Sequence, residues 1–288
     1  MDVTQAKTFL MVVQLRNFNL AAEKLFVTQS TVSTRIKVLE DKLGCTLFIR
    51  NKSGVTLTPA AKRFERHAQS MVHLWTHAKH EVMLEEEIDH SITIGARFGL
   101  WEPLLLDWLI DVRSDFPQTQ LKIKISTANS LMQDMHNGIM DFCIVYSPYS
   151  NVGLKPLKLF NERFVMVSAK PLKCSTLPKN YIFVDWGSEF SQKHTLHFPE
   201  GQKSLISANL GVLAKSLILK INASGYLPLR LVKQDIEEKK LYIIEGMPVL
   251  SIPVYAVYSE FLDKGLRTIL LNSLMNNCIH LRRSQVQN

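Results

Sequence analysis

A helix with defined ends and one polar face is the feature that most limits how this 288-residue chain can fold. Thr28 is typical of a helix N-cap and Gly44 of a C-terminal stop, which predicts a helix over residues 29–43. Four aliphatic residues recur on it at spacings of four, three and four: Val32, Ile36, Leu39 and Leu43. This spacing places them in one stripe, so the helix buries that stripe and leaves the opposite face exposed.

A shorter helix precedes this one across a tight turn. Asn19 resembles an N-cap, and residues 20–25 follow with helical periodicity before the turn at residues 26–27. Earlier still, apolar residues between Ala6 and Val13 recur at helical spacing. Two helices joined by a tight turn, the second with a polar face, predict a helix-turn-helix unit.

The polar face carries short hydrogen-bonding side chains and cations, which are Gln29, Ser30, Thr31, Ser33, Thr34, Arg35 and Lys37. An α-helix fits the major groove of DNA, where Gln, Ser, Thr and Arg side chains reach base edges. A face that is merely solvated would be richer in Glu and Lys, so this composition favours DNA binding. The sequence therefore predicts a recognition helix.

A basic hairpin is expected to follow. Residues 46–50 and 55–58 are typical of strands, with a turn at residues 51–54. Arg50 and Lys52 lie near its tip, where a wing can touch the DNA backbone or the minor groove. Residues 1–80 hold twelve Lys and Arg against five Asp and Glu, and an acidic stretch beginning at Glu81 closes this basic part of a chain whose net charge is +8. The excess indicates a polyanionic partner, double-stranded DNA.

Pro59 suits the first turn of a helix and Thr58 its cap, so a helix of about 25 residues is expected after the wing. Apolar residues recur along it at alternating spacings of three and four, at Ala61, Phe64, Ala68, Met71, Trp75, Ala78 and Val82. This heptad pattern predicts a coiled-coil-like dimer helix, although the same stripe could pack against the chain's own body. Dimerisation is favoured because a two-fold dimer reads two half-sites. Three histidines on outer positions are expected to be solvated rather than to bind a metal: His73, His77 and His80.

From Ser91 the apolar period changes from that of helices to that of strands. Strands are predicted at residues 92–95, 121–125, 141–146, 163–168, 181–184, 205–207, 241–244 and 253–258. Helices are predicted at residues 100–115, 129–136, 209–221 and 262–277, with Asn129 as the cap of the second. The alternation predicts an α/β fold with a parallel sheet, and about 200 residues suffice for two lobes.

Several classes of protein are excluded by missing patterns. The N-terminus lacks a secretory signal pattern, and the most apolar stretch, Leu104 to Ile110, is short and interrupted by Asp107. The four cysteines form no Cys-x-x-Cys pair. No G-x-S-x-G, P-loop, G-x-G-x-x-G or H-E-x-x-H motif is present. We therefore expect a cytoplasmic protein that is not an enzyme and uses no membrane, metal or cofactor.

Several short motifs of the first sixty residues together resemble the N-terminal signature of LysR-type transcriptional regulators: Ala21-Ala22-Glu23-Lys24-Leu25, Thr28-Gln29-Ser30-Thr31-Val32-Ser33, Leu43-Gly44, Leu47-Phe48 and Leu57-Thr58. The resemblance implies a bacterial winged helix-turn-helix, a dimer-forming linker helix and a two-lobed effector-binding domain similar to periplasmic solute-binding proteins. The family usually has Ala-Gly after the wing, where this chain has Ala60-Ala61. The implied domains are residues 1–58, 59–90 and 91–288, the last with one lobe of residues 91–162 and 262–288 and another of residues 163–261.

Weaker landmarks extend the resemblance into the C-terminal part. They are Phe116-Pro117, the turn from Asn137 to Asp141, and the segment from Ala223 to Pro228. The stretch from Leu100 to Trp108, with Trp186-Gly187, resembles the branch of enteric LysR-type regulators linked to the flagellar master operon.

The implied effector cleft lies between the two lobes. Open α/β sheets bind ligands beyond the carboxyl ends of their strands. That rule selects residues 97–99, 127–130, 146–147 and 185–186. The candidate effector residues among them are Arg97, Phe98, Gly99, Thr127, Asn129, Ser130, Tyr146 and Trp186. Arg97 could pair with an anionic effector and Trp186 could stack on it. Alternatively, Arg97 bridges to an acid across the cleft and Trp186 belongs to the core.

These observations predict a sequence-specific transcriptional regulator of the LysR type. We expect it to bind a promoter operator as a homodimer or homotetramer, to take a small effector and to contact RNA polymerase. One alternative is an architectural DNA-binding protein without an inducer, whose C-terminal part serves only assembly. Another is a solute-binding or enzymatic domain joined to a vestigial DNA-binding module.

Overall fold

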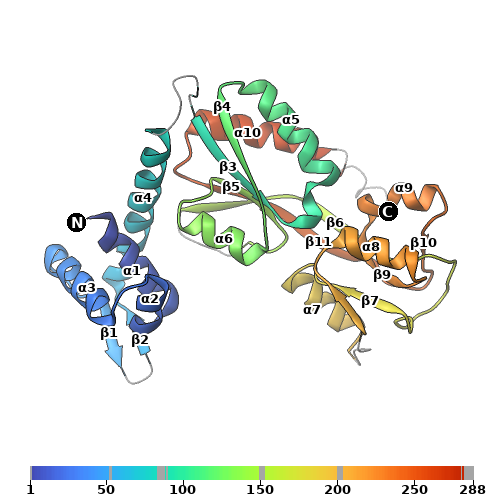
Figure 1. The fold of residues 1–288 in the computed structure, drawn as a ribbon, viewed down its shortest axis with the longest axis horizontal. Helices are drawn as coiled ribbons and strands as arrows, with labels where there is room; N and C mark the ends of the chain where they lie inside the picture. The colour runs from blue at the N-terminus through green and yellow to red at the C-terminus, as the bar shows by residue number, and fades with distance from the viewer. Residues whose placement is uncertain are drawn as a thin grey trace.

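A computed structural model describes residues 2–51, 54–82, 88, 90–148, 153–199, 204–279 and 281. Its N-terminal unit consists of α1 (Val3–Leu15), α2 (Phe18–Lys24), α3 (Gln29–Leu43), β1 (Phe48–Asn51) and β2 (Gly54–Leu57). The three helices and the antiparallel hairpin surround one apolar core, seen at the left of Figure 1. This arrangement is a winged helix-turn-helix, as the sequence predicts.

Local capping explains where these helices begin and end. The Thr28 hydroxyl accepts a hydrogen bond from the Thr31 amide, and Gly44 adopts the left-handed conformation with φ of 66°. Both ends of the recognition helix are therefore those predicted. The cap of α2 is Asn17, not Asn19, because the Asn17 side chain accepts hydrogen bonds from two amides of the first turn.

The linker helix α4 (Pro59–Glu81) begins where predicted, and the Thr58 hydroxyl accepts a hydrogen bond of 3.1 Å from the Ala61 amide. Its first half packs against α1, where Ala61, Ala68 and Val72 are buried in the core of the N-terminal unit. The interpretation of His73 as solvated is wrong. Its side chain is buried and faces Ser259 and Phe261 of the C-terminal part. The side chains of His77 and His80 lie outside the described residues.

The C-terminal part is built on one mixed sheet that runs through two lobes (Figure 1). The first lobe contains β3 (His90–Ala96), β4 (Thr119–Ile125) and β5 (Phe142–Val145), which run parallel. The second contains β7 (Tyr181–Val184), β8 (Ile206–Ala208) and β9 (Ser224–Pro228), also parallel. Two long antiparallel strands, β6 (Leu154–Ser168) and β11 (Leu250–Ser259), connect the lobes, and the short β10 (Tyr242–Ile243) pairs with β6.

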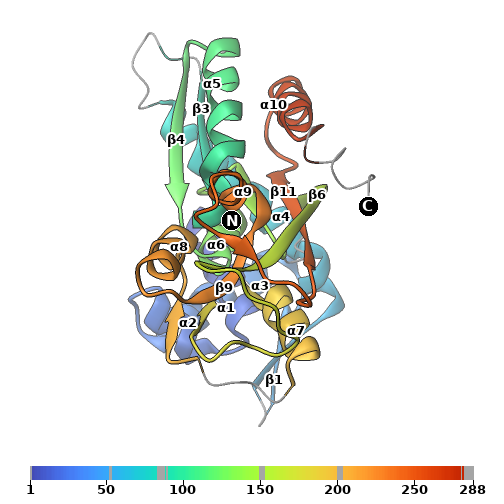
Figure 2. The ribbon, with the colours of Figure 1, turned by 90° about the vertical axis from the view of Figure 1, so that its right-hand side faces the viewer.

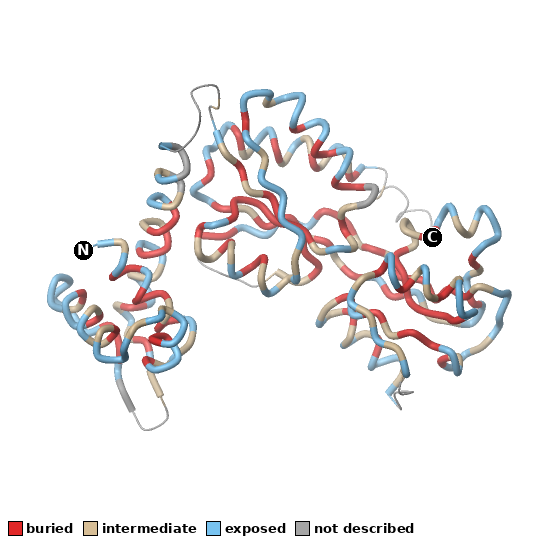
Figure 3. The backbone as a smooth tube through the Cα atoms, viewed as in Figure 1, coloured by how far each residue is buried: buried red, intermediate tan, exposed pale blue. Residues whose placement is uncertain are grey.

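Helices cover both faces of this sheet. In the first lobe, α5 (Leu106–Asp115) and α10 (Lys264–Asn277) lie together on one face, and α6 (Ala128–His136) lies on the other (Figure 1, Figure 2). The second lobe carries α7 (Ser188–His197), α8 (Gly211–Lys220) and α9 (Leu229–Glu237). Figure 3 shows the buried backbone along the strands and at the junction of the lobes, where the largest apolar cluster lies.

The sequence predicts this α/β class correctly but misses several elements. Residues 163–168 are only the end of the crossover strand β6, and α7, β9 and α9 are not predicted. The predicted helix over residues 100–115 begins with a 3-10 turn (Phe98–Leu100) and a π-helical turn (Trp101–Leu105) before α5. The cap of α6 is Thr127, not Asn129. Within the described residues, no helix is long and apolar enough to span a bilayer.

Candidate DNA-binding surface and effector cleft

The face of α3 opposite its buried stripe carries Gln29, Ser30, Ser33, Thr34 and Lys37. At about 100° per residue these five side chains fall within an arc of about 140°, wide enough to enter a groove. Ser33 is half-buried and the other four are exposed. Gln29 Nε2 donates to Ser33 Oγ at 3.1 Å, which fixes the two side chains in a common orientation.

Three residues predicted for this surface have other contacts. Arg35 lies on the flank of α3, where its guanidinium donates to the hydroxyl of Thr8, a fully buried residue of α1. The hydroxyls of Ser30 and Thr31 each lie 2.8 Å from that of Thr28, so both take part in the helix cap, although Ser30 is exposed and Thr31 is half-buried. The structure therefore brings Gln29, Ser33 and Lys37 together and turns Arg35 toward the protein.

The wing is held to α3 by Glu40, a residue that is not among the predicted site residues. One carboxylate oxygen of Glu40 accepts hydrogen bonds from the amides of Leu47 at 2.6 Å and Phe48 at 3.2 Å. Arg50 lies in β1 opposite Val55, but its side chain is outside the described part of the chain. Lys52 is also outside it. The motif Leu39-Glu40 also belongs to the family signature, but its role could not be predicted, because its partners are backbone amides beyond the helix end.

The predicted dimer seam is divided by the structure. Phe64 and Met71 pack partly, and Ala68 completely, against the core of their own N-terminal unit. Trp75 and Val82 are exposed, and Ala78 is half-buried. The first half of the stripe thus follows the alternative of packing on the chain's own body, and only the second half presents apolar surface to a partner.

A cavity of about 370 Å³ lies between the two lobes. Its walls include Arg97, Phe98, Thr127, Asn129 and Tyr146, five of the eight predicted effector residues. The remaining lining residues are Ala128, Ser147, Asp185, Gly187, Ser188, Ser191 and Asn209. Cavities of a few hundred Å³ are typical of small-molecule sites.

Arg97 crosses the cleft to the second lobe. Its Nη2 donates to the backbone carbonyl of Asp185 at 3.0 Å, and its guanidinium carbon lies 6.0 Å from the centre of the Tyr146 ring. The bridge is made to a backbone oxygen rather than to the expected acidic side chain. The Asp185 carboxylate instead accepts from the Gly187 amide at 2.8 Å.

Three predicted effector residues do not line the cavity. Trp186 is buried, donates to the carbonyl of Tyr226 at 2.9 Å and packs against Gly99 and Gly211, so it belongs to the core and cannot stack on an effector. Gly99 supplies the surface for that ring, and its carbonyl accepts a hydrogen bond from Arg230. The Ser130 amide completes the cap of α6 by donating to the Thr127 hydroxyl.

The second lobe contributes residues that the sequence analysis misses. Ser188 and Ser191 come from the first turn of α7, an element that is not predicted, and Asn209 follows β8. The strand-end rule, applied to β8, would have selected Asn209, whereas Ser188 and Ser191 lie within a helix and the rule does not reach them. The amino end of α7 has no side-chain cap, since Gly187 occupies the N-cap position. Its first amides are therefore available to an anion.

Buried polar groups surround the cavity. The hydroxyl of Ser147 is buried and has no hydrogen-bond partner within the described residues. Near Tyr146, Arg230 Nε donates to Glu162 Oε2 at 2.7 Å in an ion pair that is almost completely buried. Burial, with a further contribution from Glu162, raises the pKa of Tyr146 far above its usual range, so this phenol stays neutral.

The fold and these two sites define a class: a DNA-binding regulator with a winged helix-turn-helix joined to a two-lobed ligand-binding domain. Two family models match the chain, "Bacterial regulatory helix-turn-helix protein, lysR family" over residues 3–62 and "LysR substrate binding domain" over residues 85–262. The chain belongs to the LysR family of transcriptional regulators.

Individual relatives extend over the whole chain. The HTH-type transcriptional regulator HdfR of Yersinia pestis is 31% identical, with 96% of this chain and 97% of the relative covered. The fold is similar to full-length LysG from Corynebacterium glutamicum with bound effector Arg, with a TM-score of 0.60, 15% identity and coverage of 97% and 99%. It is also similar to Vibrio fischeri DarR in complex with DNA, with a TM-score of 0.57, 18% identity and coverage of 96% and 99%.

Proposed function

We propose that this regulator binds a promoter operator through the polar face of α3 and through the wing. The residues of α3 are Gln29, Ser30, Ser33, Thr34 and Lys37. The wing residues Arg50 and Lys52 contact the sugar-phosphate backbone of the DNA. The exposed polar face of α3 carries this part of the proposal, because its side chains suit base edges and its cation suits phosphate. The relative DarR forms a complex with DNA, which supports the assignment. Promoter DNA lies in the bacterial cytoplasm, so the protein is proposed to act there.

The proposed assembly is a homodimer or homotetramer. Its units are the winged helix-turn-helix of residues 1–58, the linker of residues 59–90 and the effector domain of residues 91–288. Trp75, Ala78 and Val82 supply the linker contacts between copies, because they are the seam residues that their own N-terminal unit leaves uncovered. Two copies would place two recognition helices on two half-sites. The DNA-bound regulator is further proposed to contact RNA polymerase and in this way to change transcription of the promoter.

The effector is proposed to be a small anion with hydrogen-bonding groups, bound in the cleft between the lobes. Three features support an anion: the Arg97 guanidinium, the uncapped amino end of α7 and the buried Ser147 hydroxyl without a partner in the described residues. Asp185 is the opposing charge, but its carboxylate is already engaged by the Gly187 amide. Arg97 lies in the first lobe and donates to the Asp185 carbonyl of the second. An anion that binds the guanidinium competes with this hydrogen bond and so changes the contact between the lobes.

Footprinting on genomic promoter fragments, with a salt titration of one protected site, tests operator binding. Lys37→Gln should lower the slope of log affinity against log salt by about 0.9, the value for one lost phosphate contact. Lys42→Gln is the matched control, because Lys42 is exposed on the same helix but away from the polar face. Uniform coverage without discrete sites would instead support an architectural protein.

A thermal-shift screen of small carboxylates and phosphates against the full chain tests the effector site. A ligand of the cleft should raise the melting temperature of the wild type and lose most of that effect in Arg97→Gln. Lys220→Gln removes an exposed cation of α8 outside the cavity and should respond like the wild type. An equal response of Arg97→Gln would contradict the cleft assignment.

A further inference from the structure

The turn between α2 and α3 holds an aromatic residue, Phe26, whose backbone conformation and exposure are both unfavourable. The Phe26 amide donates to the Glu23 carbonyl at 3.2 Å, and the Val27 amide donates to the Ala22 carbonyl at 3.0 Å. These two hydrogen bonds form the Schellman motif that ends many helices. Phe26 occupies its left-handed position, with φ of 54°, where the Cβ of a bulky residue crowds a carbonyl oxygen. Its side chain is nevertheless 95% exposed, so packing within the chain does not compensate for this strain.

The same pair of hydrogen bonds ends α3, α6 and α9, which shows what this position usually requires. At the ends of α3 and α6 the left-handed residue is Gly44 or Gly138, and a glycine has no Cβ to crowd. At the end of α9 it is Lys239, whose charged side chain is exposed to water. The phenyl ring of Phe26 has neither advantage. Local strain that is retained at a surface position is typical of functional sites, so we searched for a contact that this ring makes outside the chain.

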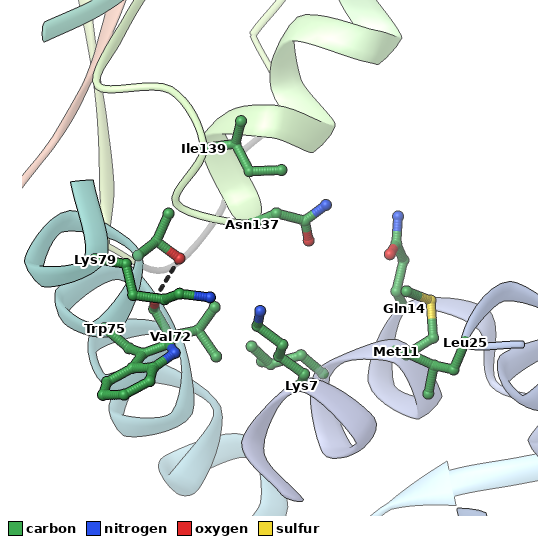
Figure 4. Close-up of a pocket in the computed structure, with 11 residues that line it drawn as sticks. Lys7, Met11, Gln14, Leu25, Val72, Trp75, Lys79, Asn137 and Ile139 are labelled. Carbon is green, nitrogen blue, oxygen red and sulfur yellow. Dashed lines mark hydrogen bonds between the residues drawn. The ribbon is translucent and has the colours of Figure 1, made fainter. Parts of the chain in front are cut away.

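The neighbours of Phe26 show on which side of the turn its ring lies. Leu25 and Val27 pack against the apolar core of the N-terminal unit, and Leu25 lines a small cavity together with Met11 of α1 (Figure 4). Phe26 belongs neither to that core nor to that cavity. Thr28 is exposed like Phe26, and its hydroxyl caps α3. The ring therefore lies beside the amino end of α3, and the amino-terminal residues of such a helix are those that contact base edges.

We propose that the Phe26 ring contacts the 5-methyl group of a thymine at the edge of the operator. This inference rests on the proposed binding of α3 to DNA, and it adds an apolar, specificity-determining contact to that polar surface. The thymine methyl group is the apolar feature that the major groove presents, and Phe is among the residues that contact it. Binding would remove the ring from water, which gives a favourable free energy that the unbound protein lacks.

Fluorescence anisotropy of the full chain with a promoter fragment that it protects in footprinting tests this contact. Phe26→Gly removes the ring and relieves the strain, so it should weaken DNA binding by about fivefold or more. Its melting temperature should equal or exceed that of the wild type. The slope of log affinity against log salt should not change, because no charge is lost. Lys239→Gly is the matched control, since it makes the same backbone change at the end of α9 and should leave DNA affinity within about twofold of the wild type.

Replacing the thymines of the same fragment one at a time by uracil, which lacks the methyl group, identifies the partner of the ring. One replacement should weaken wild-type binding by about fourfold and leave Phe26→Gly binding unchanged. Wild-type affinity in Phe26→Gly would overturn the proposal, and so would a lower melting temperature, which would assign the ring to the fold. A loss in Phe26→Gly without any uracil effect on the wild type would place the ring on deoxyribose and refute the thymine contact. A wild type that protects no discrete site would instead contradict the proposed operator binding itself.

Discussion

The buried ion pair between Glu162 and Arg230 gives a prediction whose size follows from the structure. Their side chains are only 4% and 7% exposed, and Arg230 also donates to the carbonyl of Gly99. Arg230→Met removes the cation and leaves Glu162 buried without its partner, a state that typically costs about 3–5 kcal/mol. Burial already raises the pKa of Glu162 in the wild type, against the opposing effect of Arg230, so the carboxyl should take up a proton more readily in the variant.

Urea unfolding followed by tryptophan fluorescence measures this loss, since Trp186 lies close to the pair, against Gly99. The double variant Arg230→Met/Glu162→Leu should recover most of the stability, because neither buried charge remains. Lys233→Met provides a control on the same helix. Its ion pair with Glu237 is exposed, so its loss should change stability by less than about 0.5 kcal/mol. A loss below about 1 kcal/mol for Arg230→Met alone would refute the reasoning.

Three further predictions concern separate parts of the chain. Burial lowers the pKa of His194 and His136, so unfolding should become easier as the pH falls below about 6.5, by at most about 1.4 kcal/mol per pH unit for each histidine. Thermal melts from pH 7.5 to 5.5 should show a flatter pH dependence for His194→Gln than for the exposed control His67→Gln, because His67 does not act on His194. Glu40→Ala removes the acceptor of two wing amides, so hydrogen exchange at Leu47 and Phe48 should accelerate. The expected loss of local stability is about 1–3 kcal/mol. The control Asp41→Ala changes an exposed neighbour and should leave this exchange unchanged. Gly211→Ala should lower the free energy of unfolding by about 1–3 kcal/mol, because the new Cβ would lie 2.3 Å from the Trp186 ring. Thermal melts measure this loss, and a melting temperature equal to that of the wild type would show that the ring can move aside.

The N-terminal unit could be predicted from the sequence because its signals are local. Thr28 and Gly44 define α3 through atoms within a few residues of themselves. The turn at Phe26 is equally local, although this residue adopts a φ of 54° that only the structure reveals. Asn17 and Asn19 are both plausible caps for α2, and the choice depends on which side chain reaches the open amides.

Contacts between distant parts of the chain explain the errors on the linker helix. The heptad frame assigns His73 to an outer position, and an isolated helix would expose it. The structure instead places Gly138 against His73, where an added Cβ would lie 2.7 Å from the His73 Cα, so the first lobe covers this side of α4. The glycine that permits this approach lies 65 positions away in the sequence, beyond the range of any helical pattern.

The effector cleft shows why strand-end positions alone do not define a ligand site. Arg97 and Trp186 both follow a strand of the sheet, and the rule cannot distinguish them. Their side chains differ because Gly99 and Gly211 leave a space that the Trp186 ring fills, whereas Arg97 reaches across to the Asp185 carbonyl. The position of Trp186 outside the cavity therefore depends on two glycines that do not line it and that lie 87 and 25 positions from it in the sequence, which no strand-end rule takes into account.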